Sequence, residues 1–261
     1  MFTLLLQVFL PFANLEIPEF PIRQPIVAID AGHGALNPGT RYRFRHEWRY
    51  RLFVEKAYTC DIAARTMQIL KDSAVAVRST TRGPCLETPD SGDLLDATVI
   101  DRNMRFLSND KVVSGTKEGL RERIRSAANL GTSWIDTLVV SIHVDSAHSS
   151  EIEGAYVIVS PGLRHSPLAW HIVWELGKIK PLRYFCRNDL APVVEAGKCG
   201  IKRVLLLTEP PALKTVLIEL GNVGNAEERS KLLNPDWRER LAEAIAFGII
   251  NHIRHHPAAG T

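Results

Sequence analysis

Short apolar runs alternate with longer segments of helical periodicity along this chain. Four runs rich in β-branched residues predict buried strands over 25–30, 137–144, 155–160 and 215–220. Apolar positions at helical spacing predict helices over 55–71, 118–130 and 236–254. Strands that alternate with helices are typical of a mostly parallel sheet with helices on both faces, so we expect a single α/β domain.

Two segments interrupt this alternation. In "RYRFRHEWRYRLF" (41–53), most even positions are aromatic or apolar and most odd positions are arginine. This period of two predicts a strand or hairpin with one aromatic face and one arginine face. Residues 83–117 are rich in Gly, Pro, Asp and Ser and have few periodic apolar positions, so we interpret them as an insertion or lid.

Composition and charge exclude some classes of protein. The chain has 261 residues, of which 45% are hydrophobic and 23% charged, which is ordinary for a soluble domain of this size. A net charge of +3 does not indicate a nucleic-acid partner. No apolar stretch approaches the ~18 residues of a transmembrane span.

The N-terminal segment, 1–24, is apolar without being a regular signal peptide. Its "FTLLLQVFLPFA" (2–13) has the length of a signal-peptide core, but no basic residue precedes Arg23. We therefore interpret 1–24 as an N-terminal arm or signal-like segment, 25–254 as the folded domain and 255–261 as a C-terminal tail.

Cysteines and the histidine-rich end carry weaker signals. The four cysteines lack C-x-x-C spacing, which disfavours a structural zinc site and leaves either two disulfides or ordinary core thiols. In "NHIRHHP" (251–257), His252 and His256 have helical i, i+4 spacing, which we interpret as incidental.

Three predicted strands carry a polar residue at or just beyond their carboxyl ends: His33, His143 and Glu219. The carboxyl ends of parallel strands share one edge of an open sheet, where sites form. Imidazoles and a carboxylate suit a catalytic Zn²⁺, which lowers the pKa of its water toward ~7 while a further carboxylate serves as general base. Gly32 and Gly34 remove side chains beside His33, which lets backbone and substrate come close to the metal.

Six segments, in order, resemble the signatures of zinc-dependent N-acetylmuramoyl-L-alanine amidases, which cut peptidoglycan. The resemblance spans roughly residues 25–250. The segments are "IVAIDAGHGALNPG", "EKAYTCDIAARTMQIL" (55–70), "LRERIRSAAN" (120–129), "VVSIHVDSA" (139–147), "EGAYV" (153–157) and "TVLIELGNVGNAEERSKLLN" (215–234).

The resemblance implies roles for four residues. His33, Glu55 and His143 would bind Zn²⁺, and Glu219 would activate water and protonate the leaving amine. The substrate would be the amide between the lactyl group of N-acetylmuramic acid and L-alanine of the stem peptide. Such an enzyme would act in the cell envelope, in the periplasm or after secretion.

The gap between His33 and Glu55 is longer than the resemblance leads us to expect, so the glutamate ligand needs an argument. Glu47 also follows His33, but it lies among arginines at the expected tip of a hairpin, where a carboxylate would pair with arginine. Glu55 opens a predicted helix, where packing fixes the direction of its side chain. We therefore expect Glu55 to be the ligand, with the insertion at 41–53 lying before it.

Several arginines are candidates for substrate binding. Arg43 and Arg45 could hold stem-peptide carboxylates, could bind nucleic acid together with the interleaved aromatic residues, or could belong to a solvated edge strand. Arg123 on the "LRERIR" helix could make a structural ion pair or lie near the substrate.

Two other function classes remain open. One is a catalytically silent regulator that binds peptidoglycan, although the presence of all four matched site residues disfavours it. The other is a different zinc peptidase or a deacetylase on the same architecture.

No cell-wall-binding module is visible in the sequence, so we expect targeting to come from the catalytic domain or from a protein activator or targeting partner. Asp30 and Asp145 flank the histidines and could contact metal ligands.

Overall fold

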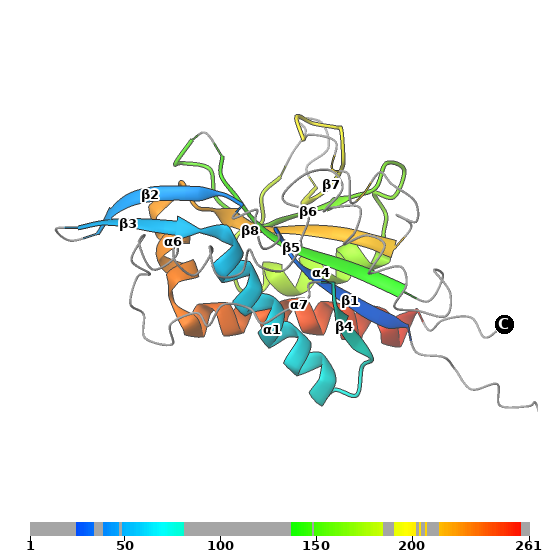
Figure 1. The fold of residues 1–261 in the computed structure, drawn as a ribbon. Coiled ribbons are helices and arrows are strands. Elements are labelled where there is room, and N and C mark those ends of the chain that lie inside the picture. The colour runs from blue at the N-terminus through cyan, green and yellow to red at the C-terminus, as the bar shows by residue number, and fades with distance from the viewer. Residues whose placement is uncertain are drawn as a thin grey trace, which may run out of the picture.

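A six-stranded sheet organises the part of the chain that the computed structural model describes (Figure 1). The described residues are 25–33, 39–46, 49–80, 137–147, 149–184, 191–201, 204, 207 and 214–256. In spatial order the strands are β4 (Val77–Ser79), β1 (Ile26–Ala31), β5 (Thr137–Asp145), β8 (Thr215–Asn222), β6 (Tyr156–Val159) and β7 (Val193–Glu195).

The strand directions confirm the predicted mostly parallel sheet. β4, β1, β5 and β8 run parallel to one another, whereas β6 pairs antiparallel with β8 and carries β7 parallel to itself. The central strands β1, β5 and β8 are buried along most of their length, as continuous apolar runs predict. β4 and β7 have three residues each, too few to produce a periodic pattern.

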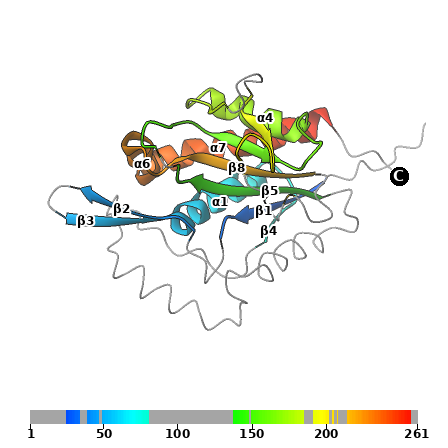
Figure 2. The same ribbon diagram turned by 90° about the horizontal axis from the view of Figure 1, so that it is seen from above.

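Three long helices lie side by side against one face of this sheet (Figures 1 and 2). They are α1 (Glu55–Asp72), α7 (Pro235–His255) and α4 (Pro167–Gly177), and the short α6 (Ala226–Leu233) precedes α7. Two of the three helices predicted from periodicity are therefore confirmed. The third, over 118–130, lies outside the described residues, so the prediction of helices on the second face stays a prediction.

Local sequence explains where these helices begin. Asn225 and Asn234 cap α6 and α7, each accepting backbone N–H bonds of the first turn through its side chain. Ser166 caps α4 in the same way and is followed by a proline at the first helical position. α1 has no side-chain cap and continues directly from the preceding strand.

The segment 41–53 forms a hairpin of β2 (Arg41–His46) and β3 (Arg49–Val54), which extends from the body of the molecule (Figure 1). In β2 the predicted alternation holds, because Phe44 is buried while Arg43 and Arg45 are exposed. In β3 it reverses: Phe53 is buried and Tyr50 is exposed. The two-residue connection places each even position of one strand opposite an odd position of the other, and opposed residues share a face. The prediction of one phase across the whole segment was therefore wrong for β3.

The described cysteines, Cys60 and Cys199, are both disulfide-bonded, which decides the open choice between disulfides and core thiols for these two. The insertion or lid predicted over 83–117 and the N-terminal segment 1–24 lie outside the described residues. None of the described helices combines the length and hydropathy needed to cross a bilayer.

Candidate metal centre

His33, Glu55 and His143 come together from three different elements. His33 follows β1, Glu55 begins α1 and His143 lies in β5. His33 Nε2 lies 3.0 Å from Glu55 Oε2, and His143 Nδ1 lies 3.1 Å from Glu55 Oε1. The two rings stand edge to face with their centroids 4.8 Å apart. One donor atom from each residue therefore points toward a shared point, as a mononuclear metal site requires.

Backbone amides fix the Glu55 carboxylate. Val144 N donates to its Oε1 at 3.0 Å, and Thr40 N donates to its Oε2 at 2.7 Å. Although burial raises the pKa of Glu55, its hydrogen bonds with His143 and His33 lower that pKa well below the usual range. The side chain is therefore an ionised carboxylate in a buried position, which is the form that binds a cation.

Two glycines leave the space in which these side chains meet. A Cβ on Gly32 would lie 2.5 Å from the Ile142 carbonyl oxygen and 2.6 Å from the His143 ring. A Cβ on Gly39, which has a φ of +71°, would lie 2.5 Å from both Glu55 Oε2 and His33 Cδ2. Gly32 therefore makes room beside His143, a contact that sequence reasoning had assigned to His33. Gly34 lies outside the described residues.

The second nitrogen of His143 is held by a buried polar chain. His143 Nε2 lies 3.1 Å from Ser141 Oγ, which donates to Asp30 Oδ2 at 2.6 Å. Thr80 Oγ1 donates to the other oxygen of Asp30, also at 2.6 Å. Asp30 thus acts on the histidine through Ser141, and this arrangement orients the ring toward Glu55.

Glu219 lies beside this cluster on the neighbouring strand. It is in register with His143 across β5 and β8 and with Tyr156 across β8 and β6. Its Oε2 is buried and accepts no hydrogen bond from the described residues. Burial, followed by the negative charges of Glu55 and Asp145, raises the pKa of Glu219 well above its usual value. A cation nearby would offset this repulsion and bring the pKa of Glu219 down again. The carboxyl group is therefore suited to taking up and releasing a proton.

Arg183 was missed by sequence reasoning. Its Nη1 lies 2.8 Å from Asp145 Oδ2, to which Tyr156 Oη also donates at 3.1 Å. The guanidinium lies over the Tyr156 ring, 5.3 Å from its centroid, and its charge opposes the rise in the pKa of Glu219. Arg183 is positioned by backbone hydrogen bonds, because its N–H donates to the Ala155 carbonyl and Ala155 N donates to the Pro181 carbonyl. No sequence signal marks that contact. Asp145 therefore binds Arg183 and Tyr156 in place of the expected metal-ligand contact.

The candidate substrate arginines lie on the hairpin or outside the described residues. Arg43 is exposed on the outer face of β2, with its guanidinium 4.3 Å from the Tyr50 ring centroid. Arg45 is exposed on the same face. No described contact joins either side chain to the His33, Glu55 and His143 cluster. Arg123 and Glu47 lie outside the described ranges.

Comparison with known families agrees with this geometry. A family model described as N-acetylmuramoyl-L-alanine amidase matches residues 27–251 of the chain. None of the curated proteins compared with the chain matches it significantly.

Solved structures of similar fold extend over nearly the whole chain. The CwlD amidase of Clostridioides difficile, solved in complex with the GerS lipoprotein, has 20% identity and a TM-score of 0.61, with 89% of this chain and 100% of that chain covered. The catalytic domain of CwlV from Bacillus (Paenibacillus) polymyxa has 22% identity and a TM-score of 0.57, with 88% and 99% covered. Ami1 of Mycobacterium smegmatis has 20% identity and a TM-score of 0.55, with 90% and 99% covered.

Proposed function

The chain belongs to the N-acetylmuramoyl-L-alanine amidase family, and on that premise we propose that it hydrolyses peptidoglycan with a Zn²⁺ ion held by His33, Glu55 and His143. Glu219 is the general base and acid. The bond cleaved is the amide between N-acetylmuramic acid and L-alanine of the stem peptide.

The observation that carries the proposal is the convergence of three donor groups on one point. His33 Nε2 and His143 Nδ1 lie 3.0 and 3.1 Å from the two oxygens of an ionised, buried glutamate. Two imidazoles and one carboxylate are a common donor set of catalytic zinc sites, in which a fourth position stays open for water. The crowding at Gly39 supports the same assignment, because any side chain there would occupy the space between Glu55 and His33.

The chemistry divides between the ion and the protein. When bound, Zn²⁺ supplies a Lewis acid that polarises the scissile carbonyl and makes water a stronger nucleophile at neutral pH. Glu219 takes a proton from the attacking water and delivers it to the amine that leaves with L-alanine. Its buried Oε2, free of described hydrogen bonds, is available for that proton. Arg183, which is paired with Asp145, carries the positive charge that opposes the rise in the pKa of Glu219.

The outer face of the hairpin is a binding surface for the stem peptide in this proposal. Arg43 and Arg45 are exposed on that face, where Tyr50 is also exposed. Guanidinium groups can bind carboxylates in a bidentate manner, and stem peptides carry carboxylates. Arg123, on a predicted helix outside the described residues, is a third candidate for substrate binding.

The site of action follows from the substrate, since peptidoglycan lies outside the cytoplasmic membrane. We infer that the protein functions in the periplasm or after secretion. The disulfide-bonded Cys60 and Cys199 support this, because disulfides persist in oxidising compartments. We also infer a protein partner that activates or targets the enzyme, by analogy with the CwlD amidase, which was solved in complex with the GerS lipoprotein.

One experiment tests the proposal. Purified peptidoglycan is digested with the protein as isolated, after chelation, and after zinc is restored, and the new chain ends are identified. We expect free stem peptides with an L-alanine N-terminus, their loss on chelation and their return with zinc. Released acetate would indicate a deacetylase, and binding without any product would indicate a regulator. Full activity in a verified metal-free preparation would refute the zinc mechanism.

A further inference from the structure

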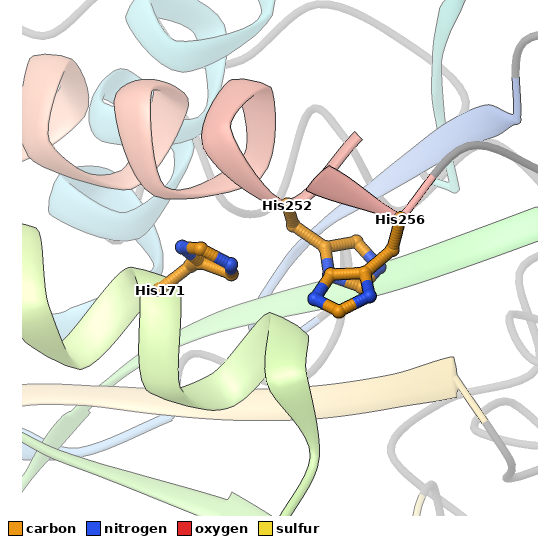
Figure 3. A group of neighbouring side chains, drawn as sticks. All are labelled: His171, His252 and His256. Atoms are coloured by element: carbon orange, nitrogen blue, oxygen red, sulfur yellow. The ribbon is translucent and has the colours of Figure 1, made fainter. Parts of the chain in front are cut away.

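A second group of imidazoles lies at the far end of the helical layer from the candidate metal centre. His171 belongs to α4, and His252 and His256 lie at the C-terminal end of α7 (Figure 3). Lys214, which directly precedes β8, is close enough to influence the charge of His252. Glu219, in contrast, lies near the carboxyl end of the same strand. The two groups are therefore separate sites.

Close packing of α4 and α7 brings the histidines together. A Cβ on Gly248 would lie 2.6 Å from Ile172 Cα and 2.9 Å from Ile172 N, so the two backbones touch at this crossing. His171 precedes Ile172, and His252 follows Gly248 by one helical turn. His256 follows His252 by a further turn, so both project from the same face of α7. The helix crossing thus fixes the separation of His171 from His252.

The ring positions are those of a chelating group. The His252 and His256 centroids are 5.1 Å apart, and the His171 centroid lies 6.1 Å from that of His252 and 5.8 Å from that of His256. One nitrogen from each of the three rings lies within 4.8 Å of the other two. Tetrahedral zinc with bonds of about 2.0–2.1 Å needs its donors about 3.3 Å apart. Rotation of the half-buried His171 ring and the exposed His256 ring toward His252 can close this difference.

Two of the three histidines have lowered pKa values, and His252 has a ring nitrogen with no described partner. His252 Nδ1 is buried and has no hydrogen bond to any described residue. Burial, together with His256, His171 and Lys214, lowers the pKa of His252 to about 4. Burial and the neighbouring His255 and His256 also lower the pKa of His171, against the opposing effect of Glu175. Protons therefore compete weakly with a metal for His171 and His252 at neutral pH.

The surroundings favour an imidazole-only donor set. The carboxylate of Glu175, which acts on the pKa of His171, is already bound by Lys178 at 2.6 Å and by Asn251 at 3.1 Å. His255 stacks on His171 with centroids 5.5 Å apart, and its Nδ1 is 2.8 Å from the Asn251 carbonyl oxygen. Imidazole donors without carboxylates suit zinc, copper or nickel, whereas calcium and magnesium prefer oxygen.

We propose that His171, His252 and His256 form a second metal site, which binds Zn²⁺ and fastens the last turn of α7 to α4. This site would be structural, because it joins two helices and lies away from Glu219. It is independent of the proposed function, which uses a different set of ligands.

The test counts metal ions at the two sites separately, on protein prepared without a polyhistidine tag. Zinc per chain is measured after equilibration and dialysis in wild type, in His33→Ala/His143→Ala and in His252→Gln/His256→Gln. We expect two, one and one, and none when all four substitutions are combined. A wild type with one zinc, retained in the His252→Gln/His256→Gln protein, would refute the second site and leave the first intact.

Two controls keep the result interpretable. His256→Ala alone, at an exposed helix end, should remove the second zinc without altering the fold seen by circular dichroism. His165→Ala, at an exposed histidine just before α4, should keep both zinc ions. In the His33→Ala/His143→Ala protein, added Zn²⁺ should raise the melting temperature, and His256→Ala should abolish that rise. Loss of the second zinc in His165→Ala to the same extent would show nonspecific surface binding and overturn the proposal.

Discussion

The ion pair of Lys180 and Glu228 gives a prediction whose size follows from burial. Lys180 Nζ lies 2.8 Å from Glu228 Oε1, and the two side chains are only 5% and 6% exposed. Lys180 also donates to the Leu220 carbonyl, and Glu228 Oε2 accepts from Asn222 N at 2.7 Å. The pair therefore holds the carboxyl end of β8, just beyond Glu219, against α6.

Replacing Lys180 by methionine leaves the Glu228 carboxylate buried without its counter-charge. Breaking a buried ion pair in this way costs about 3–5 kcal/mol. For a domain of about 150–250 residues, each kcal/mol lowers the melting temperature by about 2–4 °C. The expected loss for Lys180→Met is therefore about 6–20 °C.

Lys178 provides a matched control two residues away. It makes an ion pair of 2.6 Å with Glu175, but its side chain is 54% exposed. Solvent-exposed pairs contribute about 0–1 kcal/mol, so Lys178→Met should lower the melting temperature by at most about 4 °C. The same chemical change at the two lysines thus separates the effect of burial from that of losing a charge.

The assay is thermal and denaturant unfolding of metal-free protein, so that ligand binding does not add to stability. A further variant, Lys180→Met/Glu228→Gln, removes the stranded charge and keeps an oxygen for Asn222 N. We expect it to recover more than half of the stability lost in Lys180→Met. Equal losses for Lys180→Met and Lys178→Met, or no recovery in the double variant, would refute the reasoning.

Four further predictions concern the candidate metal centre. Glu219→Gln should lower kcat by about 10²–10⁴-fold with zinc content unchanged, and loss of zinc in that variant would make Glu219 a ligand. Glu55→Ala should lose zinc while Glu47→Ala keeps it, as measured by metal analysis; the reverse would place the insertion after the ligand. Gly39→Ala should weaken zinc binding in a competitive titration, because its Cβ would press on Glu55 Oε2, and an unchanged affinity would contradict this. Because the pKa of Glu219 is raised in the folded state, its contribution to stability is fully present below about pH 4.5 and is lost as the pH rises through the folded pKa. Metal-free wild type should therefore lose stability relative to Glu219→Gln on raising the pH, and parallel urea-unfolding curves across pH would contradict it.

The central strands could be predicted because a strand that is buried on both faces is a continuous apolar run in the sequence. β1, β5 and β8 are continuous apolar runs that end near polar residues, and a parallel sheet brings those ends to one edge. That rule was enough to expect His33 and His143 near each other. Their actual distances to the Glu55 carboxylate depend on Thr40 and Val144 backbone amides, which no residue pattern encodes.

Other features were missed for identifiable reasons. α4 went unpredicted although Ser166 and the proline after it are a helix-start signal, because its apolar residues are too dense to show a clear face. Arg183 comes beside Glu219 only through backbone pairing with Ala155, a contact that joins distant segments. The grouping of His171 with the C-terminal histidines likewise depends on a helix crossing at Gly248. In each case the deciding contact is tertiary.

The hairpin explains how a long insertion can separate two candidate metal ligands, His33 and Glu55, without disturbing them. The chain leaves the site at Thr40 and returns at Glu55, where Glu55 N donates to the Thr40 carbonyl at 2.9 Å and Thr40 N donates to Glu55 Oε2. The antiparallel ladder from the Arg41–Val54 pair outward closes the insertion on itself. The distance between its two ends is therefore set by one strand pair and does not depend on hairpin length. A change in hairpin length would therefore leave the ends of the hairpin, which belong to the candidate metal centre, in place.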